Sequence, residues 1–378
     1  MHHLKNSNHI ACFFATSGHS GVDRIVKNLL PGMVEAGYQV DLLKIRNHGP
    51  QLTGKSHGVR VIELQAKHVY TAVPGLVSYL RHKRPNVLLT DKDRVNRSAI
   101  LARLLALAKT RLAVRLGTTV SLNLASRGHL DRMVQRTSMR FLYRYADAII
   151  MPSMGAATDF SQTTGIPRNS ISVVPSPIVT PELYKQSETL IDHPWFQTGE
   201  TPVILGVGEL STRKDFATLL RAFAAMSDNS AYRLVILGRG RQRERLESLA
   251  RELGIADRFS LPGFVDNPYP YMKRARLLAL TSRWEGLGIV LVEALALGTP
   301  VVATDCPNGP AEVLGNGRFG SLAPVGDHLA LANAMAEQLN QPPTAEQFQQ
   351  AVTPFSLNNS VAGYLRAMGC TANEPESR

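Results

Sequence analysis

The feature that most restricts the fold of this chain is a regular alternation of short apolar runs with amphipathic helical patterns along nearly its whole length. Runs rich in valine, isoleucine and leucine predict buried strands, and the segments between them repeat apolar residues at helical spacing. Strands that alternate with helices form βαβ units and mostly parallel sheets. The predicted strands form two series: residues 10–15, 39–45, 59–64, 86–90, 112–116 and 148–153, and then 203–208, 232–238, 259–264, 276–282 and 301–305.

A polar stretch with prolines, from Pro181 to Pro202, separates the two series. The length of 378 residues also exceeds one ordinary core, because domains usually hold about 100–200 residues. We therefore predict an α/β protein with two Rossmann-like domains, residues 1–185 and 186–355. Ligands of such sheets bind at the carboxyl ends of the strands, against helix N-termini and glycine turns.

The positive charge of the chain lies in its first half. The whole sequence holds 42 Lys and Arg against 30 Asp and Glu, a net charge of +12. Up to Lys185 the counts are 25 and 10, a net of +15, and the remainder holds 17 and 20, a net of −3. A basic half of this kind can face nucleic acid, an anionic membrane surface or a phosphorylated substrate.

Two further compositional features bear on the cellular setting. The longest apolar stretch, residues 286–303, is interrupted by Glu293 and Pro300, whereas a spanning helix needs roughly 18 unbroken apolar residues. Cys12, Cys306 and Cys370 are odd in number and far apart, so they predict neither a disulfide framework nor a zinc site. We expect a cytoplasmic protein that meets membranes only peripherally.

Two local motifs resemble sites that their surroundings do not favour. Gly49 to Ser56 matches the P-loop pattern, but residues 58–64 alternate like a strand, whereas a P-loop must lead into a helix. We interpret it as a connection between two strands. Asp91-Lys92-Asp93 follows a predicted strand and resembles a Mg²⁺ or Mn²⁺ site, but Lys92, Arg94 and Arg97 can neutralise both acids. We therefore expect no metal cofactor.

A glycine turn, Ser17 to Gly21, joins the first predicted strand to the helix that begins at Val22. Gly18 and Gly21 allow a ligand to approach the backbone and leave helix amides open to an anion. Donor binding by Gly18 and Gly21 is one interpretation of this turn. The simpler one is a plain connection between strand and helix, which every Rossmann-like domain needs.

The most informative stretch runs from Ser282 to Val302. A predicted strand ends at Ser282, a glycine-rich turn carries Glu285, and a helix from about Gly288 to Leu297 carries Glu293. An acid within an apolar helix is costly to bury unless it has partners, and two sugar hydroxyls would serve a carboxylate well. The amides of Leu287, Gly288, Ile289 and Val290 would present the positive helix end to a phosphate.

At these residues the chain resembles the GT-B fold glycosyltransferases of family 4. Retaining members carry a glutamate, seven residues and a second glutamate, which Glu285 and Glu293 reproduce. The resemblance includes Gly298-Thr299-Pro300 and residues 305–312, and extends from Gly206 to about Met335. It implies two Rossmann-like domains that face each other across a cleft, and a C-terminal helix, within residues 356–378, that packs back on the first domain.

The resemblance also implies roles for individual residues. Glu293 would bind the ribose hydroxyls of a nucleotide-sugar donor, and Glu285 would contact the donor sugar near the reacting centre. Lys214 would neutralise the diphosphate, and Arg213 would replace the arginine that many members carry where this chain has Glu209. The loop after Arg115 lacks the histidine that many relatives place near Gly117.

We therefore predict a retaining glycosyltransferase that moves a sugar from a nucleotide-diphosphate donor, UDP-linked by resemblance, to a lipid-linked or polysaccharide acceptor in bacterial surface-glycan synthesis. A nucleotide-sugar epimerase on the same fold is the alternative, and it would turn over donor without an acceptor. A basic nucleic-acid-binding protein is a further alternative, although aromatics are only 6% and no nucleic-acid-binding signature appears.

A stripe of arginines in the basic half predicts the peripheral partner. Arg132, Arg136, Arg140 and Arg144 recur every four residues and so share one side of a helix. A solvated helix face is the simpler interpretation of any single charge run. With the +15 bias of this half, we instead predict docking on an anionic membrane that high salt reverses, at about 1 kcal/mol for each basic residue.

Overall fold

The structure is a computed structural model that describes residues 8–16, 21–49, 52, 58–125, 128–197 and 199–370. The chain forms two compact units: unit 1 contains Met1–Pro177 and Phe355–Arg378, and unit 2 contains Ile178–Pro354. The division falls at Pro177, ahead of the boundary that the sequence predicts at Lys185. The intervening helix α7 (Pro181–Ser187) packs on α10 (Tyr269–Arg274), which explains its place in unit 2.

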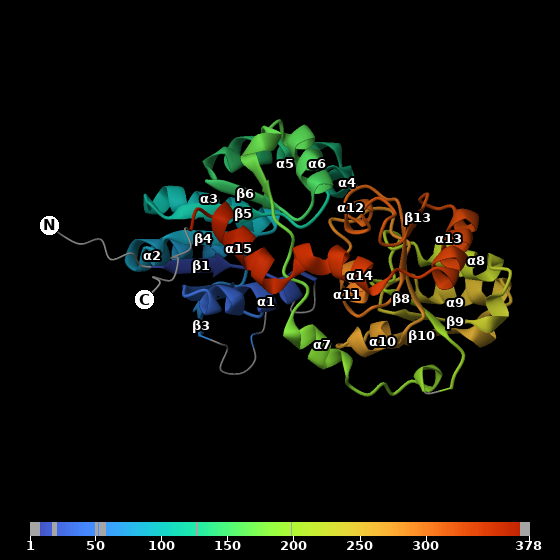
Figure 1. The fold of residues 1–378 in the computed structure, drawn as a ribbon. Helices are drawn as coiled ribbons and strands as arrows, with labels where there is room; N and C mark the ends of the chain where they lie inside the picture. The colour runs from blue at the N-terminus through green and yellow to red at the C-terminus, as the bar shows by residue number, and fades with distance from the viewer. Residues whose placement is uncertain are drawn as a thin grey trace. The chain divides into compact units, whose positions relative to one another are not determined.

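Unit 1 is built on a parallel sheet of seven strands in the order β3-β2-β1-β4-β5-β6-β7 (Figure 1). Six of these strands correspond to the predicted first series, and β7 is a short strand absent from it. The register aligns Ala11 with Asp41 on one side of β1 and with Leu88 on the other. The strands are β1 (His9–Phe13), β2 (Gln39–Ile45), β3 (Val59–Leu64), β4 (Val87–Asp91), β5 (Arg111–Arg115), β6 (Ala148–Met151) and β7 (Ile171–Val173).

The inner strands of this sheet are buried on both faces, which explains why β1 and β6 are mostly apolar. In β1, Ala11 and Phe13 enter one hydrophobic core, whereas Ile10 and Cys12 enter the other. The helices of unit 1 are α1 (Gly21–Glu35), α2 (Val73–Lys83), α3 (Asp93–Ala106), α4 (Val120–Ala125), α5 (His129–Leu142), α6 (Met154–Thr164) and α15 (Leu357–Ala367).

The C-terminal helix α15 belongs to unit 1, as the resemblance implies, although 177 residues of unit 2 precede it along the chain. It packs against α1, and Gly32 makes this close approach possible. A Cβ atom at Gly32 would lie 2.7 Å from Cγ2 of Val361. The buried side chain of Tyr364 joins the same core as Leu29 and Met33 of α1.

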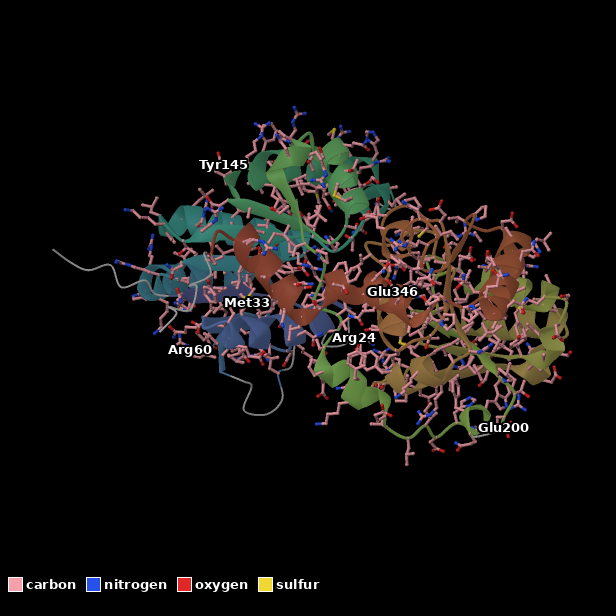
Figure 2. The ribbon with its side chains drawn as sticks, in the orientation of Figure 1. Arg24, Met33, Arg60, Tyr145, Glu200 and Glu346 are labelled. Carbon is pink, nitrogen blue, oxygen red and sulfur yellow. The ribbon has the colours of Figure 1, made fainter. Side chains whose placement is uncertain are left out.

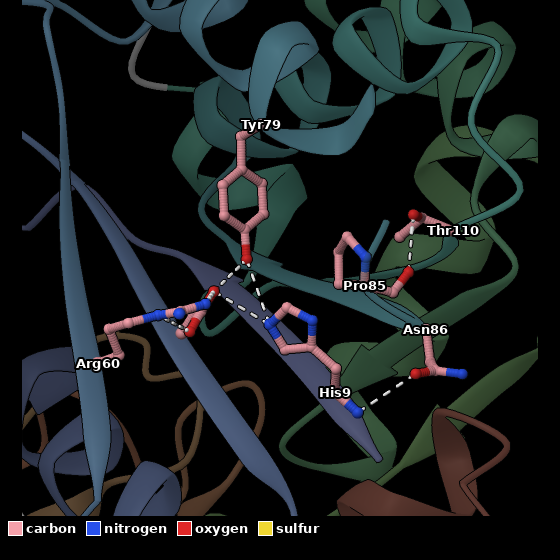
Figure 3. Close-up of polar contacts among 7 residues, drawn as sticks. His9, Arg60, Tyr79, Pro85, Asn86 and Thr110 are labelled. Carbon is pink, nitrogen blue, oxygen red and sulfur yellow. Dashed lines mark hydrogen bonds and ion pairs between the residues drawn. The ribbon is translucent and has the colours of Figure 1, made fainter. Parts of the chain in front are cut away.

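A buried carboxylate on β2 of unit 1 binds side chains from β1, β3 and α2, and Figure 3 shows these residues. Asp41 of β2 is fully buried and accepts hydrogen bonds from both arms of Arg60, at 2.8 and 2.6 Å. The Tyr79 hydroxyl donates to it at 2.5 Å, and Nε2 of His9 lies 3.0 Å away. Burial by itself would raise the pKa of Asp41, but hydrogen bonds from Arg60, Tyr79 and His9 lower it. The cluster therefore stabilises an ionised carboxylate inside the fold.

Unit 2 is built on a parallel sheet of six strands in the order β10-β9-β8-β11-β12-β13. The predicted second series is present, and β13 is an added short strand at the sheet edge. The strands are β8 (Val203–Val207), β9 (Arg233–Leu237), β10 (Phe259–Gly263), β11 (Leu277–Leu280), β12 (Val301–Thr304) and β13 (Ser321–Ala323).

The hydrophobic core of unit 2 includes Leu219 and Phe223 of α8, and Leu331 and Met335 of α13, packed on the sheet (Figure 1). Besides α7 and α10, its helices are α8 (Phe216–Ala225), α9 (Arg243–Glu252), α11 (Ile289–Ala296), α12 (Pro310–Val313), α13 (His328–Asn340) and α14 (Ala345–Val352).

Candidate functional site

The candidate site lies in unit 2, where the loops after β8, β11 and β12 meet at the carboxyl ends of three neighbouring strands. Backbone and hydroxyl groups hold these loops together. The Thr281 hydroxyl donates to the Lys214 carbonyl at 2.8 Å, and the Arg283 amide donates to the Arg213 carbonyl at 2.8 Å. The Thr304 hydroxyl donates to the Ser282 carbonyl at 2.6 Å. Ligands of open parallel sheets bind at this edge.

Two glycines allow neighbouring loops to approach closely at this edge. A Cβ atom at Gly238, just after β9, would lie 1.8 Å from the carbonyl oxygen of Gly208. Gly309 has φ +98°, and its Cβ atom would lie 2.5 Å from the backbone of Leu287. Any larger residue would push the loop after β12 away from the start of α11, so glycine is required for this packing.

Three predicted site residues come together around the carboxylate of Glu285. Nζ of Lys214 donates to Oε1 of Glu285 at 2.6 Å, and Nη1 of Arg213 lies 3.0 Å from the same oxygen. The Ser282 hydroxyl also donates to Oε1, at 2.7 Å. Glu285 and Lys214 are each 8% exposed. Two cations and one carboxylate leave one net positive charge at the carboxyl edge of the sheet.

The electrostatics of this cluster keep Glu285 ionised. Burial alone would raise the pKa of its carboxyl group, but the charges of Lys214 and Arg213 lower it, with help from hydrogen bonds donated by Lys214 and Ser282. The neighbouring thiol behaves in the opposite way. Burial, and secondarily the charge of Glu285, raises the pKa of Cys306 to about 12. The thiol therefore stays protonated and inert at neutral pH.

Glu293 lies in α11 and is buried, with 1% of its surface exposed. The hydroxyl of Tyr269, the first residue of α10, donates to its Oε1 at 3.3 Å. A buried carboxylate needs such donors, and hydroxyl groups are suited to supply them. Glu293 lies within a helix, as the sequence predicts, whereas Tyr269 is a partner that the sequence analysis did not identify.

Helix α11 begins one residue later than predicted, at Ile289, and Gly288 before it adopts a left-handed backbone with φ +84°. The first amides of a helix have no carbonyl one turn earlier to bind. The amides of Ile289 and Val290, which follow Gly288, therefore present partial positive charge at the helix N-terminus, and the side chain of Leu287 is buried beside them.

The structure places the other predicted features in unit 1. Gly21 begins α1, whereas Gly18 lies outside the described residues. Of the P-loop-like motif, Gly49 forms an isolated bridge with Thr16, and residues 53–56 lie outside the described part. Strand β3, not a helix, follows the motif, which agrees with its interpretation as a connection.

The two carboxylates of Asp91-Lys92-Asp93 bind cationic side chains. Asp93 pairs with Arg97 at 2.6 Å, and Tyr143 donates to it at 3.1 Å. Asp91 pairs at 3.0 Å with Arg115 of the neighbouring strand β5, a partner that the sequence did not identify. The backbone of Lys92 has φ +74°, which is unusual for a lysine.

Arg115 is 3% exposed and connects distant parts of unit 1. Besides Asp91, its guanidinium donates to the hydroxyl of Tyr364 in α15 at 2.7 Å and to the hydroxyl of Ser176 at 3.1 Å. A Cβ atom at Gly117 would lie 3.1 Å from Nη1 of Arg115, so the loop passes close to the guanidinium. The network stabilises the C-terminal helix against the carboxyl edge of the sheet.

Among the described residues, no three histidine, cysteine or acidic side chains are grouped as metal ligands would be. Within the same part of the chain, none of the helices combines the length and hydropathy needed to span a bilayer.

Comparison with known families accounts for both units. Residues 20–177 match the family described as a glycosyl transferase 4-like domain, and residues 189–353 match the glycosyl transferases of group 1. The second match contains Arg213, Lys214, Glu285 and Glu293. The two matches together cover most of each unit.

The chain is also similar to individual glycosyltransferases in sequence and in structure. An N-acetylgalactosaminyltransferase of Campylobacter jejuni, named for its diphospho-undecaprenol glycan substrate, is 28% identical to this chain, and the match covers 87% of this chain and 90% of that protein. The lipopolysaccharide outer core galactosyltransferase WaaB has a TM-score of 0.74 at 19% identity, with 96% of this chain and 99% of that one covered. HepE of Anabaena with UDP-glucose has a TM-score of 0.72 at 20% identity, covering 95% and 99%.

The matched domains, the two parallel sheets and the similarity to these enzymes lead to one assignment: the chain is a glycosyltransferase with a 4-like domain in residues 20–177 and a group 1 domain in residues 189–353, and it has the GT-B fold.

Proposed function

We propose that this chain is a retaining glycosyltransferase that transfers a sugar from a UDP-linked donor to a lipid-linked or polysaccharide acceptor in bacterial surface-glycan synthesis. The observation that carries the proposal is the convergence of Lys214 and Arg213 on one oxygen of Glu285, at the carboxyl edge of the unit 2 sheet. The diphospho-undecaprenol substrate of the Campylobacter relative and the UDP-glucose bound to HepE support the acceptor and donor classes.

The proposed roles follow from charge. The donor diphosphate would compete with Glu285 for Lys214 and Arg213, while the amides of Ile289 and Val290 bind its oxygens. The released Glu285 carboxylate would then face the sugar as positive charge develops on the anomeric carbon. In the reaction, the bond from that carbon to the phosphate oxygen breaks on the face where the acceptor oxygen bonds, and the acceptor proton passes to the diphosphate.

The proposed setting is the cytoplasmic face of the inner membrane, where a lipid-linked acceptor would be presented. Affinity measurements with a panel of nucleotide sugars, followed by acceptor screening, test the proposal. Product with the anomeric configuration of the donor, measured by nuclear magnetic resonance, would support retention. Inverted product would refute it, and donor turnover without an acceptor would favour an epimerase.

Replacing Glu293 with alanine should weaken donor binding at least tenfold. The reason is the loss of two proposed ribose contacts, because a hydrogen bond to a charged group contributes about 1.5–3 kcal/mol. Calorimetric titration with UDP measures the effect. Glu346→Ala in α14 is a matched control with an exposed carboxylate in the same unit. Unchanged UDP affinity in folded Glu293→Ala protein would remove Glu293 from the donor site.

We also predict that activity survives treatment with EDTA. Lys214, Arg213 and the α11 amides would supply the positive charge that other glycosyltransferases take from a divalent ion. Initial rates with and without chelator measure this. Loss of activity that Mn²⁺ restores would contradict the prediction and direct attention to Asp91 and Asp93.

A further inference from the structure

A second ion pair joins the two loops of unit 2 that carry the charged groups of the candidate site. Nη2 of Arg283, in the loop after β11, lies 3.1 Å from Oδ2 of Asp215, in the loop after β8. The backbone amide of Arg283 also donates to the Arg213 carbonyl at 2.8 Å. Arg283 therefore holds the loop after β8 at two points, one on each side of Lys214 along the chain.

The two ion pairs between these loops run in opposite directions. In one, Lys214 of the loop after β8 contacts Glu285 of the loop after β11. In the other, the loop after β11 supplies the cation and the loop after β8 supplies the acid. In the proposed reaction the donor diphosphate takes Lys214 from Glu285, so the first pair separates. The second pair contains none of the proposed donor-binding groups, and it therefore still joins the loops when the donor is bound.

The carboxylate of Asp215 does not serve the helix that it precedes. An aspartate directly before a helix usually accepts a hydrogen bond from one of the first helix amides. The backbone of Asp215 is instead left-handed, with φ +46°, and within the described residues its side chain forms no such bond to α8. Its Oδ2 contacts Arg283 and accepts a bond from the Thr218 hydroxyl at 3.0 Å. Since helix stability alone would favour the usual cap, the contact with the loop after β11 explains this orientation better.

Neither net charge nor folding stability accounts well for this pair. The charges of Arg283 and Asp215 cancel, so together they add nothing to the attraction for a diphosphate. The Arg283 side chain is 49% exposed, and ion pairs with an exposed partner contribute little to stability. Position is the property that the pair controls. A displacement of about 1 Å in an active site can cost about a hundredfold in rate, and Lys214, next to Asp215 in the chain, would move with its loop.

We propose that Arg283 is a positioning residue of the transferase. Through the Asp215 carboxylate and the Arg213 carbonyl, it keeps the cations of the loop after β8 in place when the donor diphosphate separates them from Glu285. The inference rests on the proposed donor site, and it adds a residue that acts through another and contacts neither donor nor acceptor.

The variants Arg283→Ala and Asp215→Asn test this proposal, because they change the local charge in opposite directions but remove the same contact. Asparagine tolerates a left-handed backbone, so the second variant keeps the loop conformation. Calorimetry of the full chain with UDP should show binding about tenfold weaker in each, the effect of impairing a hydrogen bond to a charged group. The double variant should lose no more than the weaker single variant. Arg283→Lys, which keeps a cation, should recover most of the affinity.

The pH dependence of kcat/KM provides a second readout. The charges of Lys214 and Arg213 lower the pKa of Glu285, so displacing these cations raises it. The acid limb should therefore move to higher pH in both Arg283→Ala and Asp215→Asn. Charge acting through space would instead move it up in the first variant and down in the second. The Tm of either variant should fall by less than about 3 °C.

The matched control is an exposed ion pair at the opposite edge of the unit 2 sheet. Arg233, the first residue of β9, lies 2.7 Å from Glu200, which Figure 2 shows at the edge of unit 2 in this view. Arg233→Ala and Glu200→Gln should leave UDP affinity and the kcat/KM profile unchanged.

Opposite effects of the two test variants on UDP affinity, tighter for Asp215→Asn and weaker for Arg283→Ala, would overturn positioning and identify Arg283 as a simple cation. Unchanged UDP affinity in both would also overturn it, and so would a large fall in Tm that accounts for the loss. These results leave the proposed function intact if the unchanged chain binds UDP. An unchanged chain that does not bind UDP would overturn both proposals.

Discussion

Replacement of Lys214 by alanine should lower kcat/KM by about 10²–10³-fold, the usual cost of removing one preorganised charge from an active site. Nζ of Lys214 lies 2.6 Å from Glu285 and is the more buried of the two cations there. In the proposed mechanism it meets the diphosphate as negative charge develops on the leaving group. Calorimetry should show weaker binding of UDP and unchanged binding of uridine. Equal losses for both ligands would contradict a phosphate role.

The same variant should change the pH dependence of the rate. The charge of Lys214 contributes to lowering the pKa of Glu285, so its removal raises that pKa. If ionised Glu285 is required, the acid limb of the kcat/KM profile moves to higher pH, because the carboxylate becomes protonated earlier as pH falls. Lys214→Arg keeps the positive charge, so its kcat/KM profile should stay close to that of the unchanged chain. Lys273→Ala, which removes an exposed pair with Glu188, is the matched control and should change neither rate nor profile.

Replacement of Arg115 by methionine should lower the free energy of unfolding of unit 1 by about 3–5 kcal/mol, the usual effect of leaving one partner of a buried ion pair uncompensated. Methionine fills much of the space but leaves Asp91, which is 1% exposed, without its cation. It also removes the donors to Tyr364 and Ser176. Hydrogen exchange should accelerate in β4, β5 and α15, whereas unit 2 amides should be unaffected.

The double variant Arg115→Met, Asp91→Asn provides the control, because it removes the buried charge together with its partner. It should recover a large part of the lost stability. Lys273→Ala again serves as the comparison, and an exposed pair of this kind contributes about 0–1 kcal/mol. Equal stability of the Arg115→Met chain and the unchanged chain would show that the network is not a structural support.

Much of the fold could be predicted because its signals are local. Apolar runs of strand length are visible within short windows, and they identified each described strand except β7 and β13. These two strands have three residues each, too few for a periodic pattern. The predicted boundary at Lys185 differs from the observed one at Pro177 for another reason. Helix α7 looks the same in either unit, and its packing on α10 decides where it belongs.

The candidate site, too, could be predicted only where its signals are local. Glu285 and Glu293 are eight positions apart on one strand–turn–helix segment, so their pattern is visible in the sequence. The contact of Lys214 with Glu285 joins residues 71 positions apart, and that of Arg115 with Tyr364 joins residues 249 apart. The resemblance implied that Lys214 belongs to the site, but neither composition nor periodicity shows which groups it touches. Ser282 and Tyr269 had no local signal at all.

The sequence by itself therefore determined the two parallel α/β sheets and the segment that carries both glutamates, because backbone periodicity and turn chemistry depend on near neighbours. Only the tertiary structure decided which charges pair and which apolar side chains stay exposed. Strand order brings Arg115 to Asp91, and it brings the loop with Lys214 to Glu285. On α5, a helical pattern shows which residues share a side, whereas the packing of Gln135 and Met139 inward decides that Leu130, Val134 and Phe141 face out.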